Sequence, residues 1–258
     1  MRKIPCNRLN YGLKRNTGKI IALVFHYTGN NTDTAIGNAN YFKQKRAASA
    51  HFFADEVEIV ESVAPEFTAW AVGGKKYADC QKTGGGTYHK IIKNNNSISI
   101  EMCSTGGKIS ERTQENAIAL ARDLIKKYPS IKYIVRHFDV TGKHCPAWSG
   151  WMIDDSIWQA FKNRILEPVY DYSLVFNAEF YLNRYPDLAK NGITKDTALQ
   201  HFIMHGMCEG RQGISTFDVQ AYKNRYKDLQ DAFGGNMQAY YKHYIECGYE
   251  EGRNGKTE

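Results

Sequence analysis

The last third of the chain repeats itself, and this repeat constrains the fold more than any other feature. Residues 176–188 recur 41 positions later as residues 217–229, and residues 201–211 recur 42 positions later as residues 243–253. A repeat of this length is one small structural unit that buries its apolar face against its neighbour. We therefore predict a small all-α domain over residues 175–258, built from two helical repeats of about 41 residues.

Each repeat is expected to hold two helices with recognisable ends. Asn177 and Asp218 are side chains that cap a helix N-terminus, so they should begin the first helix of each copy. Gly206 and Gly248 should end the second helix. Residues 167–174, which begin with Glu167 and a proline, are predicted to link this domain to the preceding one.

Strands and helices alternate in the first 166 residues. Periodicity predicts strands and helices in the order strand 19–25, helix 35–46, strands within 49–59, strand 97–102, helix 111–128, strand 132–136 and helix 154–166. The apolar run 19–25 is typical of a buried central strand, and 97–102 alternates in a way that puts Glu101 on one face with Ser97 and Ser99. This order predicts an α/β domain with a mixed central sheet flanked by helices.

Charge and composition exclude some partners. Residues 1–169 hold 24 Lys and Arg against 15 Asp and Glu, a balance of +9, whereas residues 170–258 hold 10 against 12. A basic surface attracts any polyanion, but no interleaved basic and aromatic motif favours nucleic acid. No apolar stretch has the length of a membrane span or a signal peptide. We therefore expect that the protein is synthesised in a bacterial cytoplasm and does not insert into a membrane. The six cysteines, which form no CxxC pair, are expected to be free thiols.

Three residues with the chemistry of zinc ligands fall at the ends of predicted strands or in the loops that follow. They are His26, His137 and Cys145. Taken singly, such a histidine is more often a packed core residue, as His51 and His89 could also be, and a single cysteine is usually a small buried hydrophobe. The loop between His137 and Cys145 is nevertheless long enough to fold a thiolate back towards the strand end.

The sequence here resembles the type 2 N-acetylmuramoyl-L-alanine amidases, which share their fold with the peptidoglycan recognition proteins. The resemblance covers roughly residues 20–158. It rests on Val-Phe-His26 with its Thr-Gly loop, Ser-Ala-His51-Phe, the strand Ile-Ser-Ile-Glu101-Met-Cys, Arg-His137 and Lys143-His-Cys145-Pro.

The resemblance implies a role for each matching residue. His26, His137 and Cys145 would bind catalytic Zn²⁺ with one position left open. Glu101 would act as general base and Lys143 would stabilise the oxyanion, and Thr28, His51 and Trp70 would contact substrate. Ala50 occupies a position where some relatives have tyrosine, which leaves the proton transfer to Glu101. His144, next to Cys145, is the alternative ligand.

The implied function is that of a phage endolysin, which cleaves the amide bond between N-acetylmuramic acid and L-alanine in the wall of a Gram-positive host. The repeats, with 10 of the 17 tyrosines, would bind the cell wall through rings that stack on sugars, or else the tyrosines form the packed seam of the helices. Two alternatives are a non-catalytic peptidoglycan-binding module and a host autolysin. The sequence leaves the host, the peptide variant and the oligomeric state open.

Overall fold

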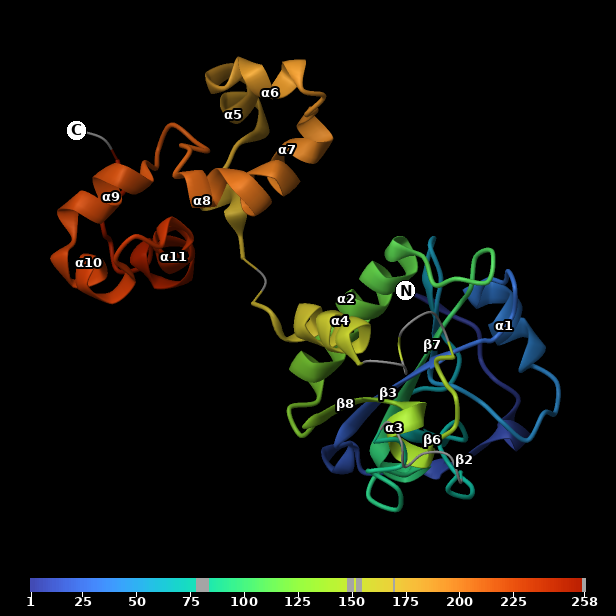
Figure 1. Ribbon diagram of the computed structural model, residues 1–258. Coiled ribbons are helices and arrows are strands. Elements are labelled where there is room, and N and C mark those ends of the chain that lie inside the picture. The colour runs from blue at the N-terminus through green and yellow to red at the C-terminus, as the bar shows by residue number, and fades with distance from the viewer. Residues whose placement is uncertain (78–83, 148–150, 152–154, 169, 257–258) are drawn as a thin grey trace. The chain divides into compact units, whose positions relative to one another are not determined.

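The computed structural model describes residues 1–77, 84–147, 151, 155–168 and 170–256 (Figure 1). Its contacts divide the chain into two compact units, Met1–Glu167 and Pro168–Glu258. Two residues to which predictions apply lie outside the described residues. They are Cys80, one of the six cysteines, and Asp154, the predicted first residue of the last helix of the first domain. No helix in the described ranges is long and apolar enough to cross a membrane.

A six-stranded mixed sheet forms the centre of the first unit, in the order β1-β5-β4-β7-β3-β8. The strands are β1 (Arg2–Lys3), β3 (Ala22–Tyr27), β4 (Phe52–Ala54), β5 (Ile59–Glu61), β7 (Ser97–Met102) and β8 (Tyr133–Arg136). Its pairs are parallel except β4 with β5. A separate antiparallel pair joins β2 (Tyr11–Lys14) to β6 (Phe67–Ala69). The predicted fold class is confirmed, and β3, whose first five residues are buried, lies between β7 and β8.

Helices cover the sheet and fix its buried face. They are α1 (Ala35–Tyr41), α2 (Glu111–Lys127), α3 (His137–Thr141) and α4 (Ser156–Leu166), with the short 3₁₀ turns η1 (Arg8–Asn10), η2 (Thr17–Lys19) and η4 (Asn94–Asn96). Ser110 caps α2, because its side chain accepts a hydrogen bond from the Thr113 amide. Leu120 of α2 and Phe161 of α4 share a core cluster with Phe25 of β3, so these two helices pack on the same face of the sheet.

Helix α1 is shorter than predicted, ending at Tyr41 instead of residue 46. The amide of Asn7 and the side chain of Asn10 both donate to the carbonyl oxygen of Phe42, at 2.9 Å each. The Asn10 side chain also accepts from the amides of Arg46 and Ala47. These contacts, made by residues more than 30 positions away, capture the backbone groups that a longer helix would need.

The second unit holds three helices per repeat instead of the predicted two. The first repeat has α5 (Ala178–Arg184), α6 (Pro186–Lys190) and α7 (Lys195–His201), continued by the π-helical turn η6 (Phe202–Gly206) and α8 (Met207–Glu209). The second has α9 (Val219–Arg225), α10 (Lys227–Phe233) and α11 (Met237–His243), continued by the π-helical turn η7 (Tyr244–Gly248). The 3₁₀ turn η5 (Tyr172–Leu174) precedes them. Asn177 and Asp218 cap α5 and α9 as predicted.

The prediction that Gly206 ends a helix is wrong, whereas the helical segment of the second repeat does end with Gly248, the last residue of η7. Gly206 has helical backbone angles and the chain continues into α8, which ends at Gly210 with φ +69°. Glycine is required at residues 206 and 248 for space, because a Cβ atom there would overlap the hydroxyl group of Tyr181 or Tyr222.

The recurring tyrosines form the packed seam of the repeats. Tyr181 and Tyr222 are fully buried and belong to one core cluster with Tyr240 and Tyr241. Tyr185 contacts Tyr181 edge to face, and Tyr226 makes the same contact with Tyr222. The structural interpretation of these tyrosines is therefore supported, and the two fully buried rings of the seam are not available to stack on a sugar.

Candidate metal centre

The strand register brings His26 and Glu101 together. His26 in β3 is paired with Glu101 in the parallel strand β7. Directly paired residues on neighbouring strands point to the same face of a sheet, so both side chains project from one side. The His26 Nδ1 atom lies 3.8 Å from Glu101 Oε1. His26 is 2% exposed, whereas the Glu101 side chain is 19% exposed and reaches solvent.

A buried ion pair positions His137, which follows strand β8 as the first residue of α3. Arg136 is 2% exposed, and its guanidinium pairs with Asp139 at 2.6 Å and with Asp155 at 2.7 Å. The backbone amide of Arg136 also donates to the Asp139 carboxylate at 2.7 Å. These bonds close the first turn of α3 on the strand end and thereby set the direction from which the His137 ring enters the site.

The loop after α3 returns Cys145 to the same place. The amide of Phe138 donates to the carbonyl oxygen of Cys145 at 2.9 Å, which ties the loop to the start of α3. Gly142 has φ +79°, a left-handed conformation that lets the chain reverse after the helix. Cys145 is 4% exposed, and its Sγ lies 3.8 Å from His26 Nδ1.

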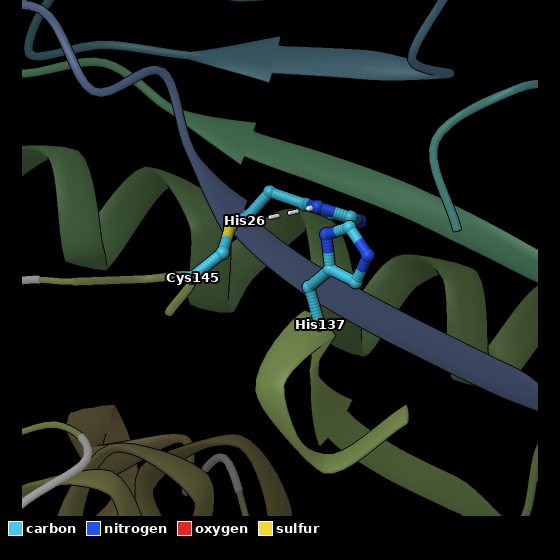
Figure 2. A group of neighbouring side chains, drawn as sticks. All are labelled: His26, His137 and Cys145. Carbon is cyan, nitrogen blue, oxygen red and sulfur yellow. Dashed lines mark hydrogen bonds between the residues drawn. The ribbon is translucent and has the colours of Figure 1, made fainter. Parts of the chain in front are cut away.

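His26, His137 and Cys145 form one buried group, shown in Figure 2, whose ligand atoms all lie within 4.8 Å of one another. His26 Nε2 and His137 Nδ1 are buried and have no hydrogen-bond partner among the described residues. Two tetrahedral zinc ligands, one nitrogen and one sulfur, would be about 3.6 Å apart. The observed separation of 3.8 Å is close to that value, so the donor set fits a metal ion.

Burial keeps the three ligand candidates uncharged. It lowers the pKa of His26 well below its ordinary value and that of His137 to about 4, and the positive charge of Lys143 lowers both pKa values further. Burial raises the pKa of the Cys145 thiol to about 12, with a smaller contribution from Glu101. Neutral imidazoles are the form in which histidine binds a metal.

A cavity of about 600 Å³ opens beside this group. Glu101 and Lys143 line it together with Thr28, which places the two predicted catalytic residues and one predicted substrate contact on one surface. Burial raises the pKa of Glu101 to about 8, Lys143 opposes this shift, and Asp33 adds to it. The carboxyl group can therefore hold or release a proton near neutral pH. Thr28 Oγ1 is buried and has no partner within the described part of the chain.

The other two predicted substrate contacts lie elsewhere. Trp70 is 39% exposed but lines a different cavity of about 440 Å³, with Val72, His89 and Asn94. His51 is 1% exposed, and its ring lies 3.0 Å from Ser99 Oγ, 3.2 Å from the Phe67 carbonyl oxygen and 2.9 Å from Arg15. A substrate cannot reach a ring enclosed in this way, so the arrangement does not support a substrate contact for His51 and indicates a structural role.

Two further features bear on the site. His144 is exposed and outside the ligand group, so Cys145 remains the ligand candidate of this loop. Asp33, which sequence reasoning missed, lines the cavity of Glu101 and accepts hydrogen bonds from Asn38 and from the Ser104 amide. The sequence indicated Asp33 only as a polar residue in the loop after a central strand. Many such residues serve only to stabilise a turn, so this position alone does not identify a site residue.

Comparison with known proteins gives a family match. The family described as N-acetylmuramoyl-L-alanine amidase matches residues 16–148, just over half of the chain. This range contains His26, Glu101, His137, Lys143 and Cys145, the residues of the centre described above.

Individual relatives agree with this match. N-acetylmuramoyl-L-alanine amidase CwlL from Bacillus licheniformis is 33% identical over 151 residues, covering 55% of this chain and 40% of the relative. The amidase BlyA from Bacillus subtilis is 31% identical over 172 residues, covering 63% and 45% respectively. The chain thus spans less than half the length of these curated relatives. The solved catalytic domain of XlyA is 24% identical with a TM-score of 0.48, covering 64% of this chain and 97% of that domain.

Proposed function

Because the chain belongs to the N-acetylmuramoyl-L-alanine amidase family, we propose that its first unit hydrolyses the amide bond between N-acetylmuramic acid and L-alanine in peptidoglycan. The observation that carries the proposal is the buried group of His26, His137 and Cys145 beside a cavity lined by Glu101 and Lys143. A site of binding alone would not require buried metal-ligand side chains next to a titratable carboxyl group.

We propose that the ion held by these three residues is Zn²⁺. Two histidine nitrogens and one cysteine sulfur form a donor set that zinc prefers, and three protein ligands leave a position for the reaction. When bound, zinc would act as a Lewis acid on the amide carbonyl and lower the pKa of water.

Glu101 is proposed to move the proton during hydrolysis. Its carboxylate would take a proton from the attacking water and pass it to the leaving nitrogen of L-alanine. A pKa near the working pH suits a group that must both accept and donate, and burial raises the pKa of Glu101 to about 8. Its position 3.8 Å from His26 keeps it next to the reacting atoms.

Lys143 is proposed to stabilise the negative oxygen that develops when water attacks the amide. Its side chain lines the same cavity as Glu101, and residue 143 precedes Cys145 by two positions. Lys143 is exposed, and a cation placed beside this cavity can approach the developing negative charge and lower its energy.

The second unit is proposed to bind the Gram-positive wall, as in a phage endolysin released after synthesis in the host cytoplasm. It packs around its own core cluster, so it can serve as a separate module. Because Tyr181 and Tyr222 are buried, recognition would depend on other, exposed side chains. A host autolysin is the alternative setting for the same chemistry.

The bond that is cleaved can be determined directly. Purified Gram-positive peptidoglycan is incubated with the zinc-supplied protein, and new L-alanine amino termini and new reducing sugar ends are counted. We expect new alanine amines and no new reducing ends. If the protein binds the wall and releases neither product, it is a recognition module and the proposed activity is wrong.

A further inference from the structure

A second group of metal-ligand side chains lies in the second repeat, far along the sequence from the first. His243 is the last residue of α11, Cys247 lies in η7, and Glu251 follows in the next turn. One ligand atom from each lies within 4.8 Å of the other two. The four-residue spacing of these residues puts successive members on one face of a helical turn.

Neighbouring side chains hold two of the three donors in place. The Tyr222 hydroxyl lies 2.9 Å from Nδ1 of His243, which leaves Nε2 of that ring for a ligand. The Nε atom of Arg253 donates to Oε2 of Glu251 at 2.6 Å, which leaves Oε1. Metal-binding histidines and carboxylates are commonly oriented in this way by a hydrogen bond on the opposite atom.

The local charge favours a cation. The charged groups that act on His243 are the carboxylates of Asp228, Glu246 and Glu251 and the guanidinium of Arg253. Three negative charges against one positive charge leave the surroundings negative. His243 and Cys247 are partly exposed and Glu251 is exposed, so an ion could enter from solvent.

The first repeat has donor residues at the equivalent positions. His201, His205 and Glu209 precede the three residues of the second repeat by 42 positions. The middle position changes from histidine to cysteine, two side chains that differ in size and polarity but share the ability to bind zinc. Tyr181 lies 3.1 Å from His201, as Tyr222 does from His243. Among the described residues of the two repeats, only the second copy brings its donors within 4.8 Å of one another.

We propose that His243, Cys247 and Glu251 bind one zinc-like divalent cation, separate from the proposed catalytic ion. A nitrogen, a sulfur and a carboxylate oxygen form a donor set that suits a metal ion of borderline softness such as Zn²⁺. Mg²⁺ and Ca²⁺ prefer sites made of oxygen atoms alone. The ion would join the end of α11 to the turn that holds Arg253, and so stabilise the C-terminal end of the second repeat.

The test uses Co²⁺ and the chain of residues 1–258 with Cys145→Ser, which removes the thiol from the first centre. A cobalt–thiolate bond gives an ultraviolet charge-transfer absorption that cobalt bound by nitrogen and oxygen lacks. We expect saturable absorption with one thiolate per chain. The absorption should fall to background when Cys247→Ser is added and remain when the exposed Cys208 is replaced by serine instead.

Two results would overturn the proposal. The first is the absence of thiolate absorption in the folded Cys145→Ser protein, and the second is absorption that survives Cys247→Ser. Thermal unfolding gives an independent readout, since Zn²⁺ should raise the melting temperature of the second unit in Cys145→Ser. An equal rise after Cys247→Ser would also contradict the assignment, and circular dichroism verifies that each variant is folded.

Discussion

The two units of the chain differ in how their polar side chains find hydrogen-bond and ion-pair partners. In the first unit, ring nitrogens of His26 and His137 are buried without a hydrogen-bond partner among the described residues. In the second, the recurring polar residues bond to one another: Arg211 lies over Tyr185 and pairs with Asp187, and Arg253 does the same with Tyr226 and Asp228. A buried polar atom without a partner lowers the stability of the fold, so its presence indicates a binding site. A polar side chain with a partner can be accounted for by the stability that the contact contributes.

The comparison also shows what a repeat can reveal. Residues 209–211 recur as residues 251–253, and the arginine of each copy pairs with an aspartate in the second helix of that copy. Gly206 and Gly248 make room for a tyrosine. The recurring residues of this chain thus mainly stabilise the fold of each repeat. The two proposed metal sites follow from donor atoms that come close together. One set comes from β3, the start of α3 and the loop after it, and the other from successive turns at the end of the second repeat.

Among substitutions that leave the proposed metal ligands in place, replacing Glu101 should have the largest effect. Glu101→Gln removes the proposed proton carrier but not the proposed metal ligands, so we expect the amidase rate to fall by about 10²- to 10⁴-fold with metal binding retained. Glu115→Gln, an exposed carboxylate in α2, is the matched control and should have no effect. An unchanged rate in Glu101→Gln would remove this residue from the mechanism.

Truncating a buried tyrosine of the repeats should cost stability in the second unit alone. Tyr222→Ala opens a cavity in the core and is expected to lower the free energy of unfolding by about 3–5 kcal/mol. Tyr249→Ala, at a position 56% exposed, should change it by less than about 0.5 kcal/mol. The check is denaturant unfolding, with amidase activity on a soluble muropeptide preserved. Equal effects of both variants would contradict the buried seam.

His51 tests whether a buried histidine of the first unit belongs to the scaffold. Burial and Arg15 lower its pKa to about 3, so the folded state resists protonation. As pH falls below the unfolded value of about 6.5, the unfolded state takes up the proton first and stability is lost, by roughly 2 kcal/mol at about pH 5. His51→Gln should show a shallower loss of unfolding free energy with falling pH. An identical pH profile would show that His51 titrates freely.

The smallest expected effect concerns the paired residues of the repeats. Arg211→Ala removes both a ring contact and ion pairs that are partly exposed, and should lower the free energy of unfolding by about 1 kcal/mol. Lys195→Ala breaks an ion pair with Glu179 in which both side chains are about two-thirds exposed, and should cost nearly nothing. Thermal unfolding of the two variants compares them, and a larger loss for Lys195→Ala would reverse this ranking.

Local patterns predicted the parts of the fold that local forces decide. The buried strand that contains His26, the alternation around Glu101 and the helix after Ser110 all lie within three residues of the predicted elements. His26 was singled out by its place at the end of a strand, whereas Glu101 received its role from the family resemblance. Their mutual distance depends on the β3–β7 register, which the sequence does not state.

The remaining differences come from contacts between distant residues. Helix α1 ends early because Asn7 and Asn10 bond to Phe42, and no local pattern contains that information. His51 is enclosed by Arg15 and Ser99, residues that are more than 30 positions away on either side. Gly206 was misread as a helix end because its function is to make space for Tyr181, a partner 25 positions earlier.

The most direct test of the central claim is the dependence of amide hydrolysis on zinc and on Cys145. Release of L-alanine amino termini from peptidoglycan is measured for the wild type, Cys145→Ser and Cys208→Ser, before and after chelation and again after Zn²⁺ is restored. We predict that the wild type and Cys208→Ser lose activity on chelation and regain it with zinc, and that Cys145→Ser is inactive throughout. Full activity of Cys145→Ser, or of the chelated wild type, would contradict a catalytic metal centre at His26, His137 and Cys145.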